Sequence, residues 1–87
     1  MEKGYIMKEY GITLSNIENA KNFNSTVTKY DVDMDLVNGR YVIDAKSVMG
    51  LFSLDLSKAV KLVIHSTDAN KIDTIITELK EKGIELT

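Results

Sequence analysis

Residues 31–36 alternate strictly between charged and apolar side chains. The charged positions are Asp31, Asp33 and Asp35, and the apolar positions are Val32, Met34 and Leu36. Such alternation is typical of a strand that packs one face on a core and exposes the other to solvent. Side chains two residues apart on a strand are separated by about 6 to 7 Å and do not converge on one ion. We therefore interpret the three aspartates as a solvated face rather than as a metal site.

A turn signal follows this strand. Asn38 and Gly39 form a pair that accepts positive φ at both central positions of a type I′ turn. After this pair, apolar side chains alternate again at Tyr41, Ile43 and Ala45. The pattern predicts a β-hairpin over residues 31–45.

Residues 4–13 mix β-branched and aromatic side chains and predict an earlier strand. Its register is left open, because two sets of side chains can face the core. One set is Tyr5 and Met7, and the other is Ile6, Tyr10 and Ile12.

Residues 59–66 predict another strand whose two faces differ in character. The core face holds Val60, Leu62 and Ile64, and the opposite face holds Lys61, Val63 and His65. His65 is the one histidine of the chain. Because no serine-histidine-carboxylate arrangement or metal-ligand spacing surrounds it, we interpret it as a surface histidine rather than a catalytic one.

A helix is predicted after the first strand. Ser15 and Glu18 have the spacing of a capping box, in which a hydroxyl and a carboxylate bind backbone N–H groups at the start of a helix. Apolar residues then recur at helical spacing, at Ile17, Ala20, Phe23 and Val27.

A second long helix is predicted near the end of the chain. Thr67 or Asp68 can cap it, and Gly83 can end it with Ile84 folded back on Leu79. Its apolar stripe consists of Ala69, Ile72, Ile75, Ile76 and Leu79.

Between the hairpin and the last strand, residues 48–52 predict a short helix, with Ser47 as its N-cap. The elements then follow the order strand, helix, strand, strand, short helix, strand, helix. This order predicts one α+β domain over residues 1–87, with four antiparallel strands in a sheet that the helices cover on one face.

Composition narrows the function classes. The 87 residues carry a net charge of −2, and no cysteine is present. An acidic domain has no long-range attraction to phosphate backbones, so we expect no direct nucleic-acid partner. Without a long apolar run or a leader pattern, we expect a cytoplasmic protein that does not bind membranes, and the sequence indicates no metal or cofactor.

The segment K-S-V-M-G-L-F-S-L at residues 46–54, which follows T-K-Y-D and a hairpin, resembles the regulatory segment of HPr. HPr is the small phosphocarrier of the bacterial phosphoenolpyruvate-dependent sugar phosphotransferase system. The resemblance is good from about Lys29 to Val63 and poor over residues 1–28. It implies an open-faced β-sandwich of four antiparallel strands and three helices. Asp55 and Ala59 depart from the family, which usually has glycines in that loop.

The HPr family has two phosphorylation sites. One is a histidine at the start of the first helix, and the aligned position here is Asn16, with Glu18 in place of a family arginine. A carboxamide cannot act as the imidazole nucleophile, and a glutamate repels phosphate. We therefore interpret this site as degenerate.

The other family site is a serine that opens the second helix and is phosphorylated by an ATP-dependent kinase. The resemblance places Ser47 there, with Val48, Met49 and Phe52 as the docking surface for partners. The implied partners are an HPr-type serine kinase and a LacI-type catabolite regulator, with enzyme I as a further candidate. Without the resemblance, Ser47 reads as an ordinary helix cap.

The leading hypothesis is a non-enzymatic regulator of carbon catabolite repression, similar to HPr paralogues that lack the histidine. One alternative is a true phosphocarrier that uses His65. Another is an interaction module that keeps only the fold. The sequence allows a monomer or a strand-exchanged dimer, because the register of the first strand is weakly specified.

Overall fold

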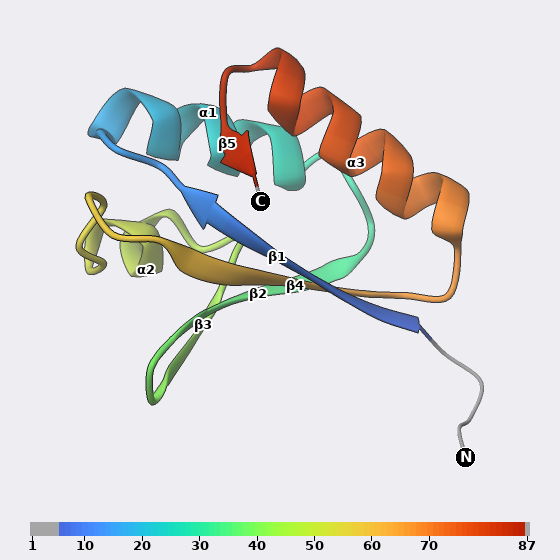
Figure 1. Ribbon diagram of the computed structural model, residues 1–87, viewed down its shortest axis with the longest axis horizontal. Helices are drawn as coiled ribbons and strands as arrows, with labels where there is room; N and C mark the ends of the chain where they lie inside the picture. The colour runs from blue at the N-terminus through green and yellow to red at the C-terminus, as the bar shows by residue number, and fades with distance from the viewer. Residues whose placement is uncertain (1–5, 87) are drawn as a thin grey trace.

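The computed structural model of the protein describes residues 6–86. Its elements are β1 (Ile6–Thr13), α1 (Ile17–Val27), β2 (Asp33–Asn38), β3 (Tyr41–Asp44), α2 (Val48–Phe52), β4 (Val60–Ser66), α3 (Ala69–Glu81) and β5 (Glu85–Leu86). The strands form one antiparallel sheet in the order β3-β2-β4-β1-β5. Figure 1 shows α1 and α3 lying side by side over one face of this sheet. The predicted α+β class and antiparallel sheet are confirmed.

The expected number of strands is wrong, because the sheet has five strands rather than four. The end of α3 explains the fifth. Gly83 has φ 86°, and the N–H of Ile84 donates to the carbonyl of Leu79 at 3.1 Å, which is the predicted Schellman stop. This turn sends the chain back so that β5 pairs with Ile12 and Thr13 of β1. A strand of two residues has no periodicity for a sequence pattern to detect.

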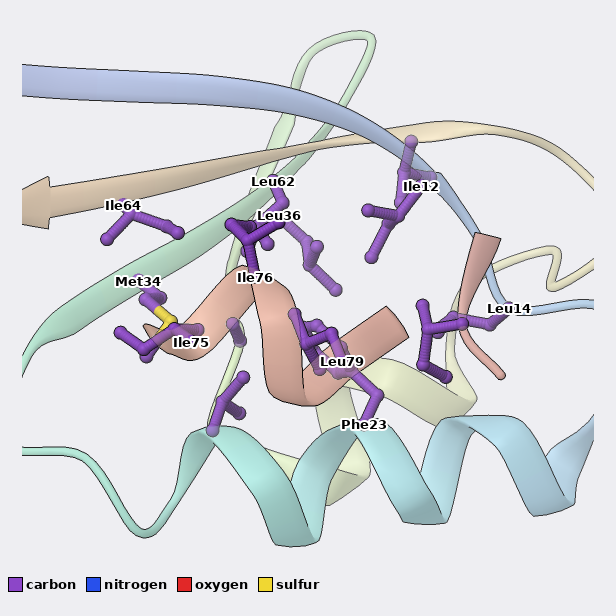
Figure 2. Packing of buried hydrophobic residues seen from close by; sticks show 14 of the residues in the cluster. Ile12, Leu14, Phe23, Met34, Leu36, Leu62, Ile64, Ile75, Ile76 and Leu79 are labelled. Atoms are coloured by element: carbon purple, nitrogen blue, oxygen red, sulfur yellow. The ribbon is translucent and has the colours of Figure 1, made fainter. Parts of the chain in front are cut away.

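The core lies between the sheet and the helices, as Figure 2 shows. All three helices contribute to it, so α2 lies on the same face as α1 and α3. The fully or nearly fully buried members include Ile12, Leu14, Phe23, Met34, Leu36, Leu51, Leu62, Ile64, Ile75 and Leu79. The core faces predicted for the hairpin strand and for β4 are confirmed.

Three residues differ from the predicted faces. Ile17 and Ala69, expected in apolar stripes, are exposed at the first positions of α1 and α3. Val63 is buried although it points away from the helices. It lies in the centre of the sheet, where Glu9 of β1 and Asp35 of β2 are its direct cross-strand neighbours. Flanking side chains on both neighbouring strands therefore remove it from solvent.

The structure fixes the register of β1. Ile12 is buried and Tyr10 packs against the core, so the even-numbered positions face the helices. This favours the second of the two open registers. Tyr5 and the side chains of Ile6 and Met7 lie outside the described part of the chain.

The hairpin forms as predicted, but its turn is displaced by one residue. Asn38 pairs with Tyr41, so the two turn residues are Gly39 and Arg40. Gly39 has φ 61°, and Arg40 does not have a positive φ. Positive φ at the first central position alone is the pattern of a type II′ turn, not the expected type I′.

A polar contact ties the α1–β2 loop to α3. The ammonium of Lys29 and the hydroxyl of Tyr30 both donate to the carboxylate of Glu78. These bonds hold the pKa of Glu78 below its ordinary value, with the Lys29 bond the larger cause and the Tyr30 bond the next. The bond to Glu78 also raises the pKa of Tyr30.

This contact predicts a pH dependence of stability. A carboxyl whose pKa is lower in the folded state stabilises the fold above its unfolded pKa, and this stabilisation is lost as the pH falls through the folded pKa. We therefore expect Glu78→Gln to be less stable than the parent at about pH 7 and to approach it at about pH 3. Urea unfolding of both proteins at each pH measures this. An equal difference at both pH values would contradict the assignment.

Candidate functional site

Ser47 begins α2 and is exposed to solvent. Its hydroxyl oxygen accepts from the backbone N–H of Gly50 at 3.2 Å, and its carbonyl accepts from the N–H of Leu51 at 3.0 Å. With φ −87° and ψ 108°, Ser47 has the extended backbone of an N-cap. The predicted cap is therefore confirmed, and Ser47 is an exposed residue.

Hydrogen bonds hold the turn that leads into α2. Asp44 accepts twice, from the N–H of Ser47 at its carbonyl (3.0 Å) and from the N–H of Lys46 at Oδ1 (2.9 Å). The Lys46 carbonyl accepts from the side-chain amide of Asn24 in α1 at 2.9 Å. The Lys46 ammonium donates to the carbonyl of Tyr30 at 2.6 Å. Ser47 is thus presented from a turn fixed on both sides.

The position of α2 depends on two neighbouring residues of the helix. Leu51 is fully buried and fixes α2 to the common core. Gly50 lies so close to β3 that a Cβ on it would stand 2.4 Å from Cγ2 of Ile43. Only glycine permits this approach without displacement of a neighbour. The contact between Gly50 and Ile43 was not predicted from the sequence. The glycine inside a five-residue helix is the feature of the sequence that could have indicated it.

The other residues of α2 are exposed. We define the α2 surface as Val48, Met49 and Phe52, of which Met49 has 77% of its surface exposed and Phe52 43%. All three residues singled out as a docking surface thus reach solvent beside Ser47. Methionine side chains adapt readily to different partner shapes. The structure therefore brings together the predicted phosphorylation site and the predicted docking residues.

The start of α1 lies near the chain that leaves α2. The N–H of Ser15 donates to the carbonyl of Leu56 at 2.8 Å. Ile17, the next apolar residue, is 58% exposed. Since Asn24 also binds the turn before α2, α1 is tied to the chain on both sides of that helix.

The predicted capping box of α1 is wrong. Ser15 lies outside the helix with φ 77°, and Asn16 is the N-cap, with Oδ1 accepting from the N–H of Asn19 at 2.8 Å. Glu18 is exposed in the first turn. Asn16, which the resemblance to HPr places at the histidine position, therefore stands at the start of α1, and its carboxamide is engaged as a helix cap.

The loop after α2 closes without a residue in the left-handed region. Ser15 is the one non-glycine with positive φ among residues 6–86, so Asp55 and Ala59 both have ordinary backbone. Asp55 Oδ1 accepts from the hydroxyl (2.7 Å) and the N–H (3.1 Å) of Ser57. These bonds, the hydroxyl first, lower the pKa of Asp55. An Asx-type turn at Asp55 thus closes this loop without the glycines that the resemblance to HPr would lead one to expect.

His65 lies in β4, on the sheet face that the helices leave open. Its Nε2 is 2.8 Å from Oδ2 of Asp35, and both side chains are about one-third exposed. The sequence pattern correctly predicts that His65 and Asp35 lie on the face away from the core, but it does not predict their contact. Cross-strand neighbours on one face make such contacts.

Two features of the described residues bear on other classes of function. Within residues 6–86, no group of three or more histidine, cysteine or acidic residues is arranged to hold a metal ion. The same part of the chain contains no helix long and apolar enough to cross a membrane. In comparison with known proteins, no protein-family model matches the chain.

Proposed function

We propose that this protein is a non-enzymatic, HPr-like regulator that acts in the cytoplasm through phosphorylation of Ser47. The observation that carries the proposal is the exposed Ser47 hydroxyl at the start of α2, adjacent to the three exposed apolar residues of the α2 surface. The resemblance of residues 46–54 to the HPr regulatory segment supports it. So does the element order, which agrees with an HPr-like open-faced β-sandwich up to the short β5.

The start of α2 can hold a phosphate group on Ser47 without a change elsewhere in the fold. The Gly50 N–H already donates to the Ser47 oxygen, and phosphate oxygens are stronger acceptors than a hydroxyl. Because Ser47 is exposed, the added charge stays in water and leaves the buried core, including Leu51, in place. A partner docked on the α2 surface would meet about two negative charges that the unmodified protein lacks. Phosphorylation of Ser47 is therefore expected to change the affinity of the α2 surface for its partners and to leave the fold as it is.

We do not expect this protein to carry a phosphoryl group at Asn16, the position that corresponds to the HPr histidine. The Asn16 carboxamide caps α1 and is not a nucleophile. Glu18, exposed beside it, would repel an incoming phosphoryl group. The proposed partners are an HPr-type serine kinase, which would add the phosphate to Ser47, and a LacI-type catabolite regulator, which would bind the phosphorylated form.

Kinase labelling tests the proposal. With an HPr-type serine kinase and ATP, we expect one phosphate per chain, located at Ser47 by mass spectrometry. The Ser47→Ala variant should take up none. Ser53→Ala is the matched control, because Ser53 is also exposed and lies at the opposite end of α2. An unlabelled parent protein, or equal labelling of Ser47→Ala, would refute the proposal.

A further inference from the structure

Asn38 and Gly39 lie where the β2–β3 hairpin turns. Asn38 is the last residue of β2 and pairs with Tyr41, and Gly39 is the first of the two turn residues. Gly39 is exposed, with open space around the position that a Cβ would occupy. Among residues 6–86, neither the side-chain amide of Asn38 nor the N–H of Gly39 makes a hydrogen bond. The amide and the neighbouring backbone nitrogen are therefore both available for reaction with each other.

The asparagines inside α1 lack this freedom. They are Asn19, Asn22 and Asn24. In each case the N–H of the following residue is a helical donor, held by a carbonyl of the preceding turn. The side-chain amide of Asn24 also donates to the carbonyl of Lys46 at 2.9 Å. The helix therefore protects these three asparagines from attack by the next backbone nitrogen.

The two remaining asparagines of the described chain are held in other ways. The Oδ1 atom of Asn16 accepts from the helix that it caps, and the next residue is Ile17, whose branched side chain hinders approach of its nitrogen. After Asn70, the N–H of Lys71 donates to Oδ1 of Asp68 at 3.2 Å. Asn38 thus differs from all of them in having a free amide, a free neighbouring N–H and a following residue without a side chain.

We propose that Asn38 is a site of spontaneous deamidation. Hydroxide takes the proton from the Gly39 N–H, and that nitrogen forms a bond to Cγ of Asn38. The Cγ–Nδ2 bond breaks, and Nδ2 takes a proton from water and leaves as ammonia, so that a succinimide ring is closed and hydroxide is regenerated. Water then opens the ring at one of its two carbonyls and supplies the oxygen of the new carboxylate. No oxidant or reductant takes part.

The end of the hairpin provides the movement that ring closure requires. Asn38 must rotate out of its extended strand conformation to bring Cγ against the next nitrogen. The pair of Asn38 with Tyr41 is the last pair before the turn, and Tyr41 is 70% exposed. Figure 1 shows this end of the hairpin standing clear of the helices. Such an end opens at a low free energy, and Gly39 accepts backbone angles that other residues resist.

The two products affect the hairpin differently. Opening of the ring at Cγ leaves an aspartate, and an Asp-Gly pair also suits a hairpin turn. Opening at the main-chain carbonyl carries the backbone through Cγ, which lengthens the chain by a CH₂ group and displaces the pair with Tyr41. Either product adds one negative charge to a hollow that Asn38 lines together with Glu9 and Lys61. The ammonium of Lys61, now 3.4 Å from Glu9, then has a second carboxylate nearby.

Incubation of the folded protein in mildly alkaline buffer tests the proposal. Peptide mass spectrometry should show a gain of about 1 Da at Asn38, with aspartyl and isoaspartyl forms separated by chromatography and ammonia released in equal amount. The asparagines of the two long helices are internal controls and should keep their amides. An Asn38 that stays unchanged, or an Asn24 that reacts as fast, would overturn the proposal. No kinase is used, so this outcome is independent of the proposed phosphorylation of Ser47.

Two variants test which nitrogen attacks. Gly39→Ala should slow the reaction at Asn38 several-fold, because the new Cβ hinders approach of the nitrogen. Arg40→Ala is the matched control, since it changes the other turn residue, leaves the Asn-Gly pair intact and should react at the parent rate. Circular dichroism verifies the fold of both variants, because alanine is strained at the φ of 61° found at Gly39. Equal rates at Asn38 in Gly39→Ala and the parent would overturn the assigned attack by the Gly39 nitrogen.

Discussion

Phe23→Ala is expected to lower the free energy of unfolding by about 3 to 5 kcal/mol, the range for a fully buried aromatic residue. Phe23 has no exposed surface, and Figure 2 shows it pointing from α1 toward Leu79 of α3. Removing the ring leaves a cavity between the two helices, which the surrounding side chains can fill only in part. Urea denaturation followed by circular dichroism measures the change, with the slope against urea checking that unfolding remains two-state.

Phe52→Ala is the matched control, because Phe52 is the other phenylalanine of the chain and lies on the exposed α2 surface. We expect it to lower the free energy of unfolding by less than about 1 kcal/mol, since part of its ring is already in water. If the two substitutions lowered the free energy of unfolding by similar amounts, the assignment of Phe23 to the core and Phe52 to the exposed α2 surface would be contradicted.

Gly50→Ala is expected to lower the free energy of unfolding by about 1 to 3 kcal/mol, the usual range for overpacking. The new Cβ would stand 2.4 Å from Cγ2 of Ile43, so α2 must move away from β3 or Ile43 must change its conformation. Alanine favours helices over glycine by about 1 kcal/mol, which offsets part of the loss. The sign of the result therefore reports whether the close contact outweighs helix propensity. Urea denaturation is again the measurement.

A second substitution separates these two effects. Ile43→Ala removes the methyl group that the new Cβ would meet. In that background Gly50→Ala should be neutral or stabilising, which appears as a coupling free energy in the double-mutant cycle. If Gly50→Ala destabilises both backgrounds equally, the contact with Ile43 is not the reason for glycine at this position.

The strands and long helices were predictable where one face of an element is buried. Alternation located β2 and β4 with their core faces, and helical spacing located α1 and α3, because burial imposes these periods. The two-residue β5 was not predictable, since its pairing with β1 depends on the stop at Gly83. The displaced hairpin turn has a similar cause, because the ladder between β2 and β3, rather than the local preference of Asn38, sets the register.

The candidate site was predictable in part. A serine before a short apolar segment correctly indicated the N-cap of α2. The cap of α1 was not predicted, because Ser15 and Asn16 are both good capping residues and the bond from Ser15 to Leu56 excludes the serine. The pairing of His65 with Asp35 depends on which strands are neighbours in the sheet, a fact of topology that neither strand contains alone.

An amide NMR spectrum of the protein before and after incubation with an HPr-type serine kinase and ATP tests the central claim most directly. The claim is that Ser47 accepts phosphate while the fold is retained. We predict that the Gly50 amide moves most, because it donates to the modified oxygen, and that core amides such as those of Ile12 and Leu62 keep their positions. Absence of phosphate at Ser47, or shifts that spread across the core strands, would contradict the account.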